Sequence, residues 1–304
     1  MRLHDYWPSS STYRGLIVAI RPAYLGGVLF FVLGAALAGT PRGALDLRAL
    51  SIGMVVMLLV HVITHYVNDA EDVATDERSQ PSPLTGGSRA IQRGLVTPAQ
   101  LLGVSAVLAV VVVLIAAAEI ATGDHLAGAL YLAILFFGYA YSGRPFMLGR
   151  RGMSEVDAGL VMGVLVPLAG AHVAGGINRA VWAAAGVLFV DTMLARMGTA
   201  FPDLEADRET GKRTIPAMVG PRRSVIAFAL LGLVVAAVGF ALAPLLPEPD
   251  WQRARAVVGA AGGLLAAWAI ASGAAARWRM LVPLVVMGPF GLSAAVLFTA
   301  ALAR

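Results

Sequence analysis

Apolar and polar residues alternate along this chain in long blocks rather than residue by residue. Blocks of about 20 mostly apolar residues can cross the ~30 Å hydrocarbon core of a membrane as helices. The blocks do not show the period of two that is typical of transmembrane barrel strands. We therefore predict an all-α polytopic membrane protein, with nine transmembrane helices bundled around a central cavity. The predicted spans are 16–38, 48–67, 98–119, 126–142, 154–174, 179–200, 223–246, 253–273 and 280–302.

The first apolar block follows a polar segment that is rich in Tyr and Trp. This segment, residues 1–15, is predicted to lie at the membrane interface. The block 16–38 is long for the core of a signal peptide and precedes many similar blocks, so a retained transmembrane helix is expected. In later spans, Pro167 and Pro283 are expected to kink their helices.

The composition agrees with a membrane protein and removes several classes of site. Hydrophobic residues make up 58% of the 304 residues and charged residues only 13%, whereas a soluble domain carries roughly 25% charged residues. The chain has no cysteine, which excludes disulfides, thiolate metal sites and a catalytic thiol. The net charge of +5 comes from arginines at the ends of the spans. That placement indicates membrane topology and not nucleic-acid binding.

The basic residues also predict an orientation. When the amino terminus is placed inside, most of the 23 Lys and Arg residues fall on the inner side. The positive-inside rule then predicts a multi-pass protein of the cytoplasmic membrane with a cytoplasmic amino terminus. Both clusters of acidic residues described next fall on the same cytoplasmic side.

The second span runs directly into a cluster of acidic side chains. Asn68, Asp72 and Asp76 are spaced by four residues, so on a helix they share one face, and Asp69 adds another carboxylate. Like charges this close repel one another and require neutralisation. Asp and Asn oxygens suit Mg²⁺, which in turn binds phosphates, so the cluster predicts a divalent metal site. A solvated acidic helix end is the alternative interpretation.

The same arrangement recurs after the sixth span, where Asp203 and Asp207 are four residues apart. Carboxylates with bound cations, next to basic loops, favour an anionic ligand, and a diphosphate satisfies both. The apolar bundle beneath offers room for a hydrophobic tail, so the pattern indicates an isoprenyl diphosphate. The basic loop residues are Arg78, Arg89, Arg93, Arg144, Arg208, Lys212 and Arg213.

The positions of the two clusters suggest how the chain is organised. They follow the second and the sixth spans, and each precedes a loop rich in Gly, Thr and Arg. We predict one transmembrane domain, 1–304, formed by pseudo-repeat halves of about 1–145 and 146–304 that share one site. Two cytoplasmic loops, 77–97 and 208–222, are predicted to cap it.

These motifs resemble the UbiA superfamily of intramembrane prenyltransferases, and the resemblance covers essentially the whole chain. NDAEDVATD, residues 68–76, resembles the first acidic signature of the family, and DLEAD, residues 203–207, resembles the second. The TGGSR loop is similar to the dihydroxynaphthoate polyprenyltransferase branch. Further similar segments are Arg21-Pro22, TGGSR at 85–89, YSGRP at 141–145 and RETGKRT at 208–214.

The resemblance implies a role for each matching residue. It implies two Mg²⁺ ions, one held by Asn68, Asp72 and Asp76 and the other by Asp203 and Asp207. Asp69 is expected to assist catalysis, together with Asp72, Asp203 and Tyr141, and Tyr141 is expected to line the pocket beside the reacting carbon. Residues expected to bind the diphosphate substrate or line its pocket are Arg144, Lys212, Arg213, Arg89, Arg78 and His65.

The resemblance also implies a reaction with more than one possible outcome. The metal ions would draw charge from the diphosphate, and an aromatic acceptor of the quinone-precursor type would capture the allylic cation. A terpene cyclase of the same superfamily, which needs no second substrate, is the alternative because it requires the same acidic motifs. A membrane transporter is a remote alternative. It would carry charges near the membrane midplane, whereas here they gather at one face.

Other titratable residues have simpler interpretations. Asp191 and Arg196 within the sixth span are interpreted as a structural charge pair or as side chains that extend to the membrane interface, and a pocket role for Asp191 is the minority alternative. His61 is interpreted as a core histidine. His65 stands where many family members have Asn, and the stretch before Asp203 also departs from the family pattern, which leaves the acceptor open.

Overall fold

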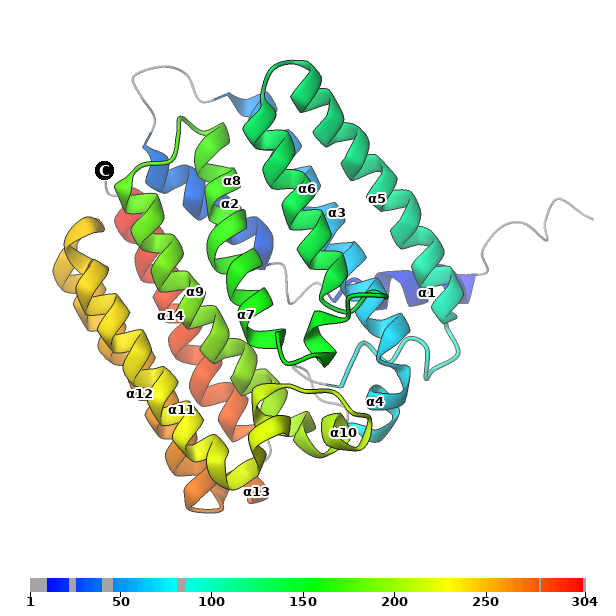
Figure 1. Cartoon of the computed structure of the whole chain (residues 1–304), viewed down its shortest axis with the longest axis vertical. Coiled ribbons are helices and arrows are strands. Elements are labelled where there is room, and N and C mark those ends of the chain that lie inside the picture. The colour runs from blue at the N-terminus through cyan, green and yellow to red at the C-terminus, as the bar shows by residue number, and fades with distance from the viewer. Residues whose placement is uncertain (1–9, 22–25, 40–45, 81–85, 279, 303–304) are drawn as a thin grey trace, which may run out of the picture.

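The computed structural model describes residues 10–21, 26–39, 46–80, 86–278 and 280–302. Every regular element in these ranges is a helix. The long helices run side by side along one axis and form an elongated bundle (Figure 1). In chain order they are α1 (Ser10–Ala19), α2 (Gly26–Ala38), α3 (Leu47–Glu71), α4 (Val73–Arg78), α5 (Pro98–Ala121), α6 (His125–Ala140), α7 (Ser154–Ala158), α8 (Val166–Val173), α9 (Arg179–Ala200), α10 (Leu204–Glu209), α11 (Ile215–Leu242), α12 (Pro249–Ala271), α13 (Ala274–Arg277) and α14 (Leu281–Leu302).

The helices agree with the predicted membrane spans. Seven helical segments of the described chain are long and apolar enough to cross a membrane, and the shorter apolar helices α2 and α6 lie where two further spans were predicted. The prediction of an all-helical polytopic membrane protein is confirmed. Short polar side chains begin several of these helices: Asp46 caps α3, Asp124 caps α6 and Asn178 caps α9. Such caps satisfy amide groups that a helix start leaves unpaired.

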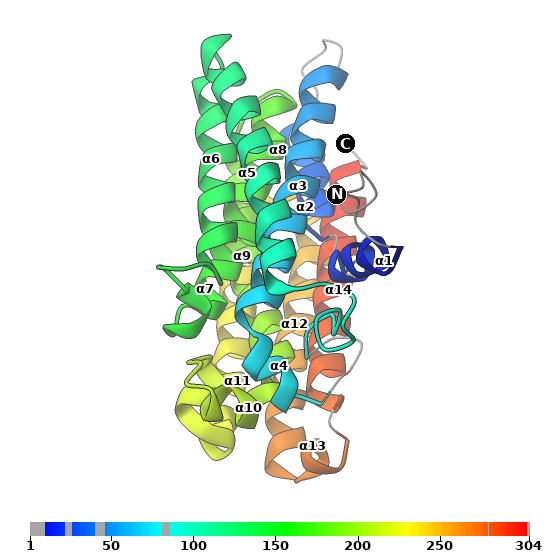
Figure 2. The same ribbon diagram turned by 90° about the vertical axis from the view of Figure 1, so that its right-hand side faces the viewer.

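The predicted extent of the first span, 16–38, is wrong. Helix α1 ends at Ala19 and lies across the bundle, whereas α2 begins at Gly26 and runs along it (Figure 2). Between them Arg21 has a left-handed φ of 51°, and a residue before proline is disfavoured in the α-helical conformation. The chain therefore turns at Arg21, while Pro22 itself lies outside the described residues.

Two other predictions about helix geometry are resolved in detail. Pro167 follows a π-helical segment, η4 (Gly159–Leu165), so the fifth span is irregular at this proline as expected. Pro283 instead lies in the first turn of α14, where no helical hydrogen bond is lost, and Pro289 is the proline inside that helix. The predicted cap loop 208–222 is partly helical, because α11 starts at Ile215 and is kinked at Gly220.

The apolar core has three parts, and the two larger ones share α9. One large part joins α2, α3, α5, α6 and α8 to the beginning of α9 and the end of α14. The other large part joins the rest of α9 to α11, α12 and α14. The small third part joins the end of α1 to α3, the loop before α5 and the start of α5. Helix α9 therefore connects the two groups of helices, and it carries the second acidic motif at its end. The predicted pseudo-repeat halves stay a prediction.

Candidate active site

The two acidic motifs lie at the same end of the bundle. Asn68 and Asp69 are on the last turn of α3, and Asp72 ends this helix before Asp76 in α4. In the second motif, a 3-10 turn, η5 (Phe201–Asp203), leads into α10. Helices α4 and α10 lie next to each other at the lower end of Figure 1, and the hydroxyls of Thr75 and Thr210 hydrogen-bond at 2.8 Å.

Lys212 connects the two motifs directly. Its Nζ donates to Asp72 Oδ2 at 2.6 Å, and its backbone amide donates to the carbonyl of Asp207 at 2.7 Å. Thr214, two residues later, donates its hydroxyl to Asp207 Oδ2 at 3.0 Å. Burial alone would lower the pKa of Lys212, but the carboxylates of Asp72 and Asp207 outweigh it and raise that pKa above its ordinary value. Lys212 is therefore a buried cation held between the motifs.

Arg150 is the second cation that binds Asp72. Its Nη2 lies 3.0 Å from Asp72 Oδ1 and 3.3 Å from Thr75 Oγ1, and its Nη1 donates to the carbonyl of Thr210 at 3.2 Å. Burial acts to raise the pKa of Asp72, but Lys212 and Arg150 outweigh burial and lower it. Arg150 was not predicted as a site residue from the sequence. Its position in the short basic segment between the fourth and fifth spans was the available signal.

Asn68 and Asp69 are held by groups from three other segments. Asn68 donates to Asp72 Oδ2 and to Ser142 Oγ, each at 2.9 Å. Asp69, which is 3% exposed, accepts from the guanidinium of Arg21 and the hydroxyl of Ser88. Asp69 thus connects the end of α1 and the loop between α4 and α5, called the first loop below, to α3. Arg21 and Ser88 belong to the family-like segments Arg21-Pro22 and TGGSR, of which Pro22 and Thr85 lie outside the described residues.

Asp76 lies beneath the first loop. The loop backbone passes so close that a Cβ on Gly87, whose φ is 70°, would lie 2.0 Å from Asp76 Oδ2. Arg89 donates to the backbone carbonyl of Asp76. Burial, followed by the charge of Asp72, raises the pKa of Asp76 to about 7. The carboxylate of Asp76 is thus covered by the loop, and the cations near it are too few to keep its pKa at the ordinary value.

The donor set at this end fits a hard divalent cation. Asp72, Asp76 and Asp207 are buried carboxylates, Asp203 lies half-buried one turn before Asp207, and Asn68 adds an amide oxygen. As these side chains stand, no three His or acidic groups of the described residues are arranged to hold an ion. Lys212 and Arg150 occupy the oxygens of Asp72 instead. A divalent ion would therefore replace the cationic side chains on this carboxylate.

The other predicted basic residues lie at the rim. The Arg144 side chain is 73% exposed and pairs with Glu71 at 3.0 Å, and Arg78 is half exposed and lies 3.6 Å from Glu209. Arg213 is also exposed. Exposed ion pairs contribute only about 0–1 kcal/mol. The structure therefore places Lys212, Arg150 and Arg21, rather than Arg144 and Arg78, on the aspartates of the first acidic motif.

Tyr141 lies in a polar chain beside the motifs. Its hydroxyl is 3.0 Å from Ser154 Oγ and accepts from Arg196 Nε at 2.7 Å. Next to Ser154, the buried Glu155 accepts from the backbone amide of Ile215 at 3.0 Å. Arg196 therefore orients Tyr141, and the predicted pairing of Arg196 with Asp191 is wrong. Asp191 binds Arg255 instead, because Arg255 of α12 faces it inside the bundle.

The two histidines of the acidic stripe differ. His61 Nε2 lies 2.8 Å from the carbonyl oxygen of Ile20, which supports its structural interpretation. The ring of His65 packs edge-on against that of His61, with centroids 4.4 Å apart. His65 lies one helical turn before Asn68, and the charge of Arg21 acts on its ring. A pocket role for His65 stays a prediction.

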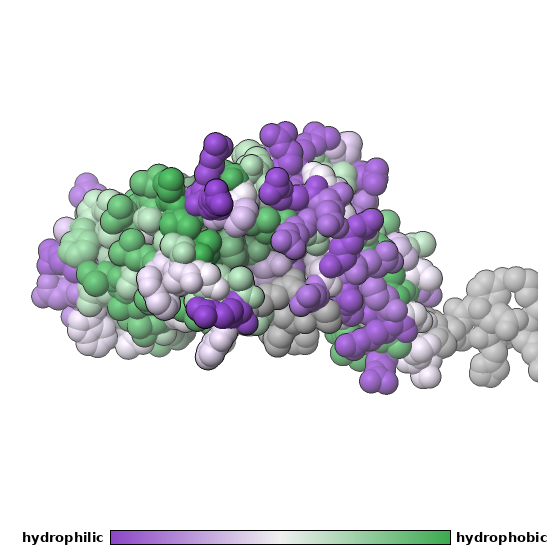
Figure 3. All heavy atoms as spheres, turned by 90° about the horizontal axis from the view of Figure 1, so that it is seen from below, coloured by the Kyte–Doolittle hydropathy of each residue, from purple (hydrophilic) through white to green (hydrophobic). Residues whose placement is uncertain are grey.

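The surface at this end is divided. Viewed along the bundle from the side of α4 and α10, hydrophilic residues gather over one half of the face and hydrophobic residues over the other (Figure 3). Two cavities lie elsewhere. One of about 10 Å³ is beside Asp191, and one of about 310 Å³ is at the opposite end, between α3 and α5. The predicted central cavity above the motifs stays a prediction.

Comparisons with known proteins identify the family and the fold of the chain. The sequence model of the UbiA prenyltransferase family matches residues 28–279. A digeranylgeranylglyceryl phosphate synthase of Natronomonas pharaonis is 29% identical over 273 residues, which cover 88% of this chain and 87% of the relative. The solved structure of a UbiA homolog from Archaeoglobus fulgidus bound to GPP and Mg²⁺ superposes with a TM-score of 0.71, at 19% identity, over 95% of this chain and 98% of that one.

A second solved structure is that of a digeranylgeranylglyceryl phosphate synthase, with a TM-score of 0.63 and 15% identity over 96% of this chain and 99% of that one. At these identities the solved structures establish the fold alone. The dihydroxynaphthoate branch, and with it the expectation of quinone or menaquinone synthesis, receives no support from these relatives.

Proposed function

The chain belongs to the UbiA prenyltransferase family, and from this premise we propose that it transfers a prenyl group from a prenyl diphosphate in a Mg²⁺-dependent reaction. The observation that carries the proposal is Lys212, which binds Asp72 of the first motif while its own backbone binds Asp207 of the second. A diphosphate with its metal ions requires acids and cations in one place, and this contact puts them there.

The residues at the centre of the site have two proposed roles, as metal ligands and as partners of the phosphates. Asn68, Asp72 and Asp76 are proposed to hold one Mg²⁺, and Asp203 and Asp207 a second. When bound, the ions supply Lewis-acid stabilisation of the departing diphosphate. Lys212 and Arg150 are proposed to move from Asp72 to the phosphate oxygens.

The remaining residues act around this centre. The first loop, tied down by Asp69 and Arg89, is proposed to cover the site and exclude water. Tyr141, held by Arg196, is proposed to face the reacting carbon. Its electron-rich ring can stabilise the positive charge that develops there.

The bond changes are the same for either class of acceptor. The bond between prenyl C1 and the diphosphate oxygen breaks, and the diphosphate leaves with the bonding electrons. The acceptor forms a bond to C1 and releases a proton. Buried carboxylates and Lys212 provide the charged surroundings in which this separation of charge is stabilised.

We propose a glyceryl phosphate lipid as the acceptor, with a hydroxyl as the attacking group. The support is the name and the coverage of the 29% identical relative, which extends over 88% of this chain. An aromatic acceptor, which the resemblance of the TGGSR segment led us to expect, is the outcome against which the lipid acceptor is tested. With that acceptor, a ring carbon would take the place of the hydroxyl oxygen.

One assay separates these outcomes. Purified protein is incubated with Mg²⁺ and radiolabelled geranylgeranyl diphosphate, and with either geranylgeranylglyceryl phosphate, dihydroxynaphthoate or no acceptor. We expect a labelled ether lipid that depends on the first acceptor and disappears in EDTA. Asp72→Asn and Asp203→Asn should each abolish it.

Each contrary product has a definite meaning. A labelled naphthoate would favour the aromatic acceptor, and a cyclic hydrocarbon formed without acceptor would make the chain a terpene cyclase. Turnover that persists in EDTA would contradict the metal role. If both Asp variants released diphosphate at an unchanged rate, Asp72 and Asp203 would not form the proposed site. The transporter interpretation would then have to be considered again.

A further inference from the structure

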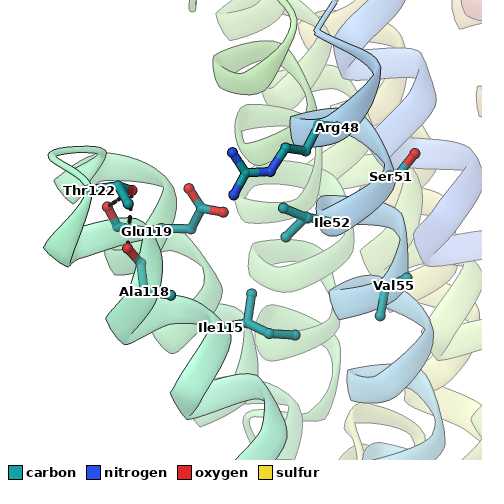
Figure 4. A pocket seen from close by; sticks show the side chains of 8 residues that line it. All are labelled: Arg48, Ser51, Ile52, Val55, Ile115, Ala118, Glu119 and Thr122. Carbon is teal, nitrogen blue, oxygen red and sulfur yellow. Dashed lines mark hydrogen bonds between the residues drawn. The ribbon is translucent and has the colours of Figure 1, made fainter.

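A groove opens on the outer surface of the bundle at the end opposite the acidic motifs. It lies between the start of α3 and the end of α5 and has a volume of about 310 Å³ (Figure 4). Its floor is apolar and its rim is polar. The floor is formed by Ile52, Val55, Ile115 and Ala118, and the rim by Arg48, Ser51, Glu119 and Thr122.

Two opposite charges face each other across this groove without closing into an ion pair. The guanidinium of Arg48 and the carboxylate of Glu119 point toward one another in Figure 4. Neither side chain takes part in a salt bridge within the described part of the chain. Arg48 lies in the first turn of α3 and Glu119 in the last turn of α5. Both positions are unfavourable for the respective charge in the helix dipole, so local helix stability does not explain them.

The groove lies at the level of a membrane interface. Helix α3 has 25 residues, and at 1.5 Å per residue it is roughly 37 Å long. Asp72 at one end and Arg48 at the other are thus separated by about the thickness of a hydrocarbon core. Arg48 and Glu119 therefore lie at the headgroup level of the other leaflet, and the apolar floor extends from them toward the membrane interior.

We propose that this groove binds a bilayer phospholipid whose headgroup carries a phosphate and a primary ammonium, as phosphatidylethanolamine does. Arg48 pairs with the phosphate, since a guanidinium matches phosphate geometry. Glu119 pairs with the ammonium, and the hydroxyl of Thr122, which already donates to the carbonyls of Ala118 and Glu119, keeps lone pairs free to accept from it. One acyl chain lies on the apolar floor.

The charge pattern selects this headgroup over others. A purely anionic headgroup satisfies Arg48 but leaves Glu119 facing a negative charge. A quaternary ammonium cannot donate a hydrogen bond to Glu119. A second protein copy would have to present both charges with an apolar ridge between them, and a lipid carries that arrangement by itself.

Native mass spectrometry of the detergent-purified full chain tests the proposal. The protein is mixed with equal amounts of phosphatidylethanolamine, phosphatidylglycerol and phosphatidylcholine of identical acyl chains, and the retained adducts are compared. We expect phosphatidylethanolamine to be retained most strongly. Arg48→Gln should lower its retention roughly tenfold, in line with the loss of a charge-assisted pair. Glu119→Gln should remove the preference over phosphatidylglycerol while leaving phosphatidylglycerol retention unchanged or higher.

Arg179→Gln is the matched control, because Arg179 is an exposed arginine in the first turn of α9 at the same end of the bundle. It should behave as the unmodified chain does, and thermal unfolding should show all three variants folded. Equal retention of the three lipids, or an Arg48→Gln effect no larger than that of Arg179→Gln, would overturn the proposal. So would a dimer that dissociates in Arg48→Gln, since the groove would then bind a second copy. Prenyl transfer is a separate readout, which we expect to be unchanged in all three variants.

Discussion

At the residue scale, the site is a set of buried charges that neutralise each other. Asp72 receives Lys212 on one oxygen and Arg150 on the other. Isolated buried charges are costly, and each partner offsets the desolvation of the other. The same arrangement is suited to ligand exchange. A phosphate could replace Asp72 as the partner of Lys212 and Arg150, while its metal ions replace these two cations as partners of Asp72.

Lys212→Ala should weaken prenyl diphosphate binding more than it slows the chemical step. A hydrogen bond to a charged group contributes about 1.5–3 kcal/mol, so KM for the diphosphate should rise roughly 10- to 100-fold. The product should not change, because Lys212 binds the diphosphate end of the substrate. Steady-state kinetics with varied prenyl diphosphate measures both quantities.

Two control variants make the Lys212 experiment specific. Lys212→Arg keeps the charge and should recover much of the affinity, whereas Arg78→Ala removes an exposed charge that lies 3.6 Å from Glu209. Because exposed pairs contribute little, KM should stay within about threefold of the original in Arg78→Ala. An unchanged KM in Lys212→Ala, or an equal rise in Arg78→Ala, would contradict the assigned role.

The acidic residues could be predicted from the sequence, but their partners could not. Four-residue spacing predicts that Asn68, Asp72 and Asp76 share one helix face. In the structure the helix is interrupted at Asp72, between α3 and α4, so Asp76 lies on a separate short helix. Arg150 reaches Asp72 only because the segment after α6 folds back over the end of α3. Arginines are abundant at the ends of all spans, so composition alone could not separate Arg150 from Arg144.

At the element scale, close contacts between helix backbones hold the first group of helices together. A Cβ on Gly34 of α2 would lie 2.0 Å from the carbonyl oxygen of Pro167, and one on Gly170 of α8 would lie 1.8 Å from that of Phe31. Small residues let helices approach this closely inside membranes. Helices α2 and α8 are therefore packed backbone to backbone through these two glycines.

Gly34→Ala and Gly170→Ala should each destabilise the protein by about 1–3 kcal/mol or more, because overpacking against backbone atoms cannot be relieved by side-chain movement. Gly103→Ala in α5 is the control, since nothing lies within 4 Å of the added Cβ. It should leave stability unchanged or raise it, as alanine favours helix over glycine. Unfolding in detergent measures all three, and equal effects would contradict the packing argument.

A buried ion pair connects three helices of the second group. Arg255 of α12 donates to Asp191 of α9 at 2.8 Å and to Ser293 of α14 at 2.7 Å. Asp191 and Arg255 are 5% and 2% exposed, so removal of one charge leaves the other buried without its partner. The pair fixes how α9, and with it the second acidic motif, sits against α12 and α14.

Arg255→Met should therefore destabilise the protein by about 3–5 kcal/mol. The double variant Asp191→Leu with Arg255→Met should be less destabilised than the sum of the two single variants, because no charge remains unpaired. Equilibrium unfolding of the four proteins gives the coupling energy. Simple additivity would show that the two side chains do not depend on each other.

The approximate positions of the long apolar helices could be predicted from the apolar blocks, but the path of the chain between them could not. The block 16–38 was predicted as one span although it contains Arg21-Pro22, and the chain turns there because Arg21 is a left-handed residue before a proline. Similarly, the sequence contains several glycines in apolar spans, and only the packing of α2 on α8 shows which of them are indispensable.

At the scale of the whole molecule, the fold brings together two segments that are distant in sequence. Helix α3 ends in one motif and α9 leads into the other, and both helices belong to the shared apolar core. The convergence of α4 and α10 therefore follows from the packing of the bundle as a whole. Three contacts connect the two regions, and all of them use the short segment from Thr210 to Lys212: Lys212 binds Asp72, while Thr210 binds Arg150 and Thr75.

This convergence can be tested by a disulfide, because the chain contains no cysteine to compete. The hydroxyls of Thr75 and Thr210 are 2.8 Å apart, so the Cβ atoms of cysteines at these positions should be within disulfide range. Thr75→Cys combined with Thr210→Cys should oxidise to an intramolecular disulfide, seen by mass spectrometry as one linked peptide pair. Thr75→Cys combined with Thr122→Cys, whose second site lies at the opposite end of the bundle, should stay reduced. A Thr75–Thr210 pair that oxidised no more readily than this control would show that the motifs lie apart, and a shared diphosphate site would then be impossible.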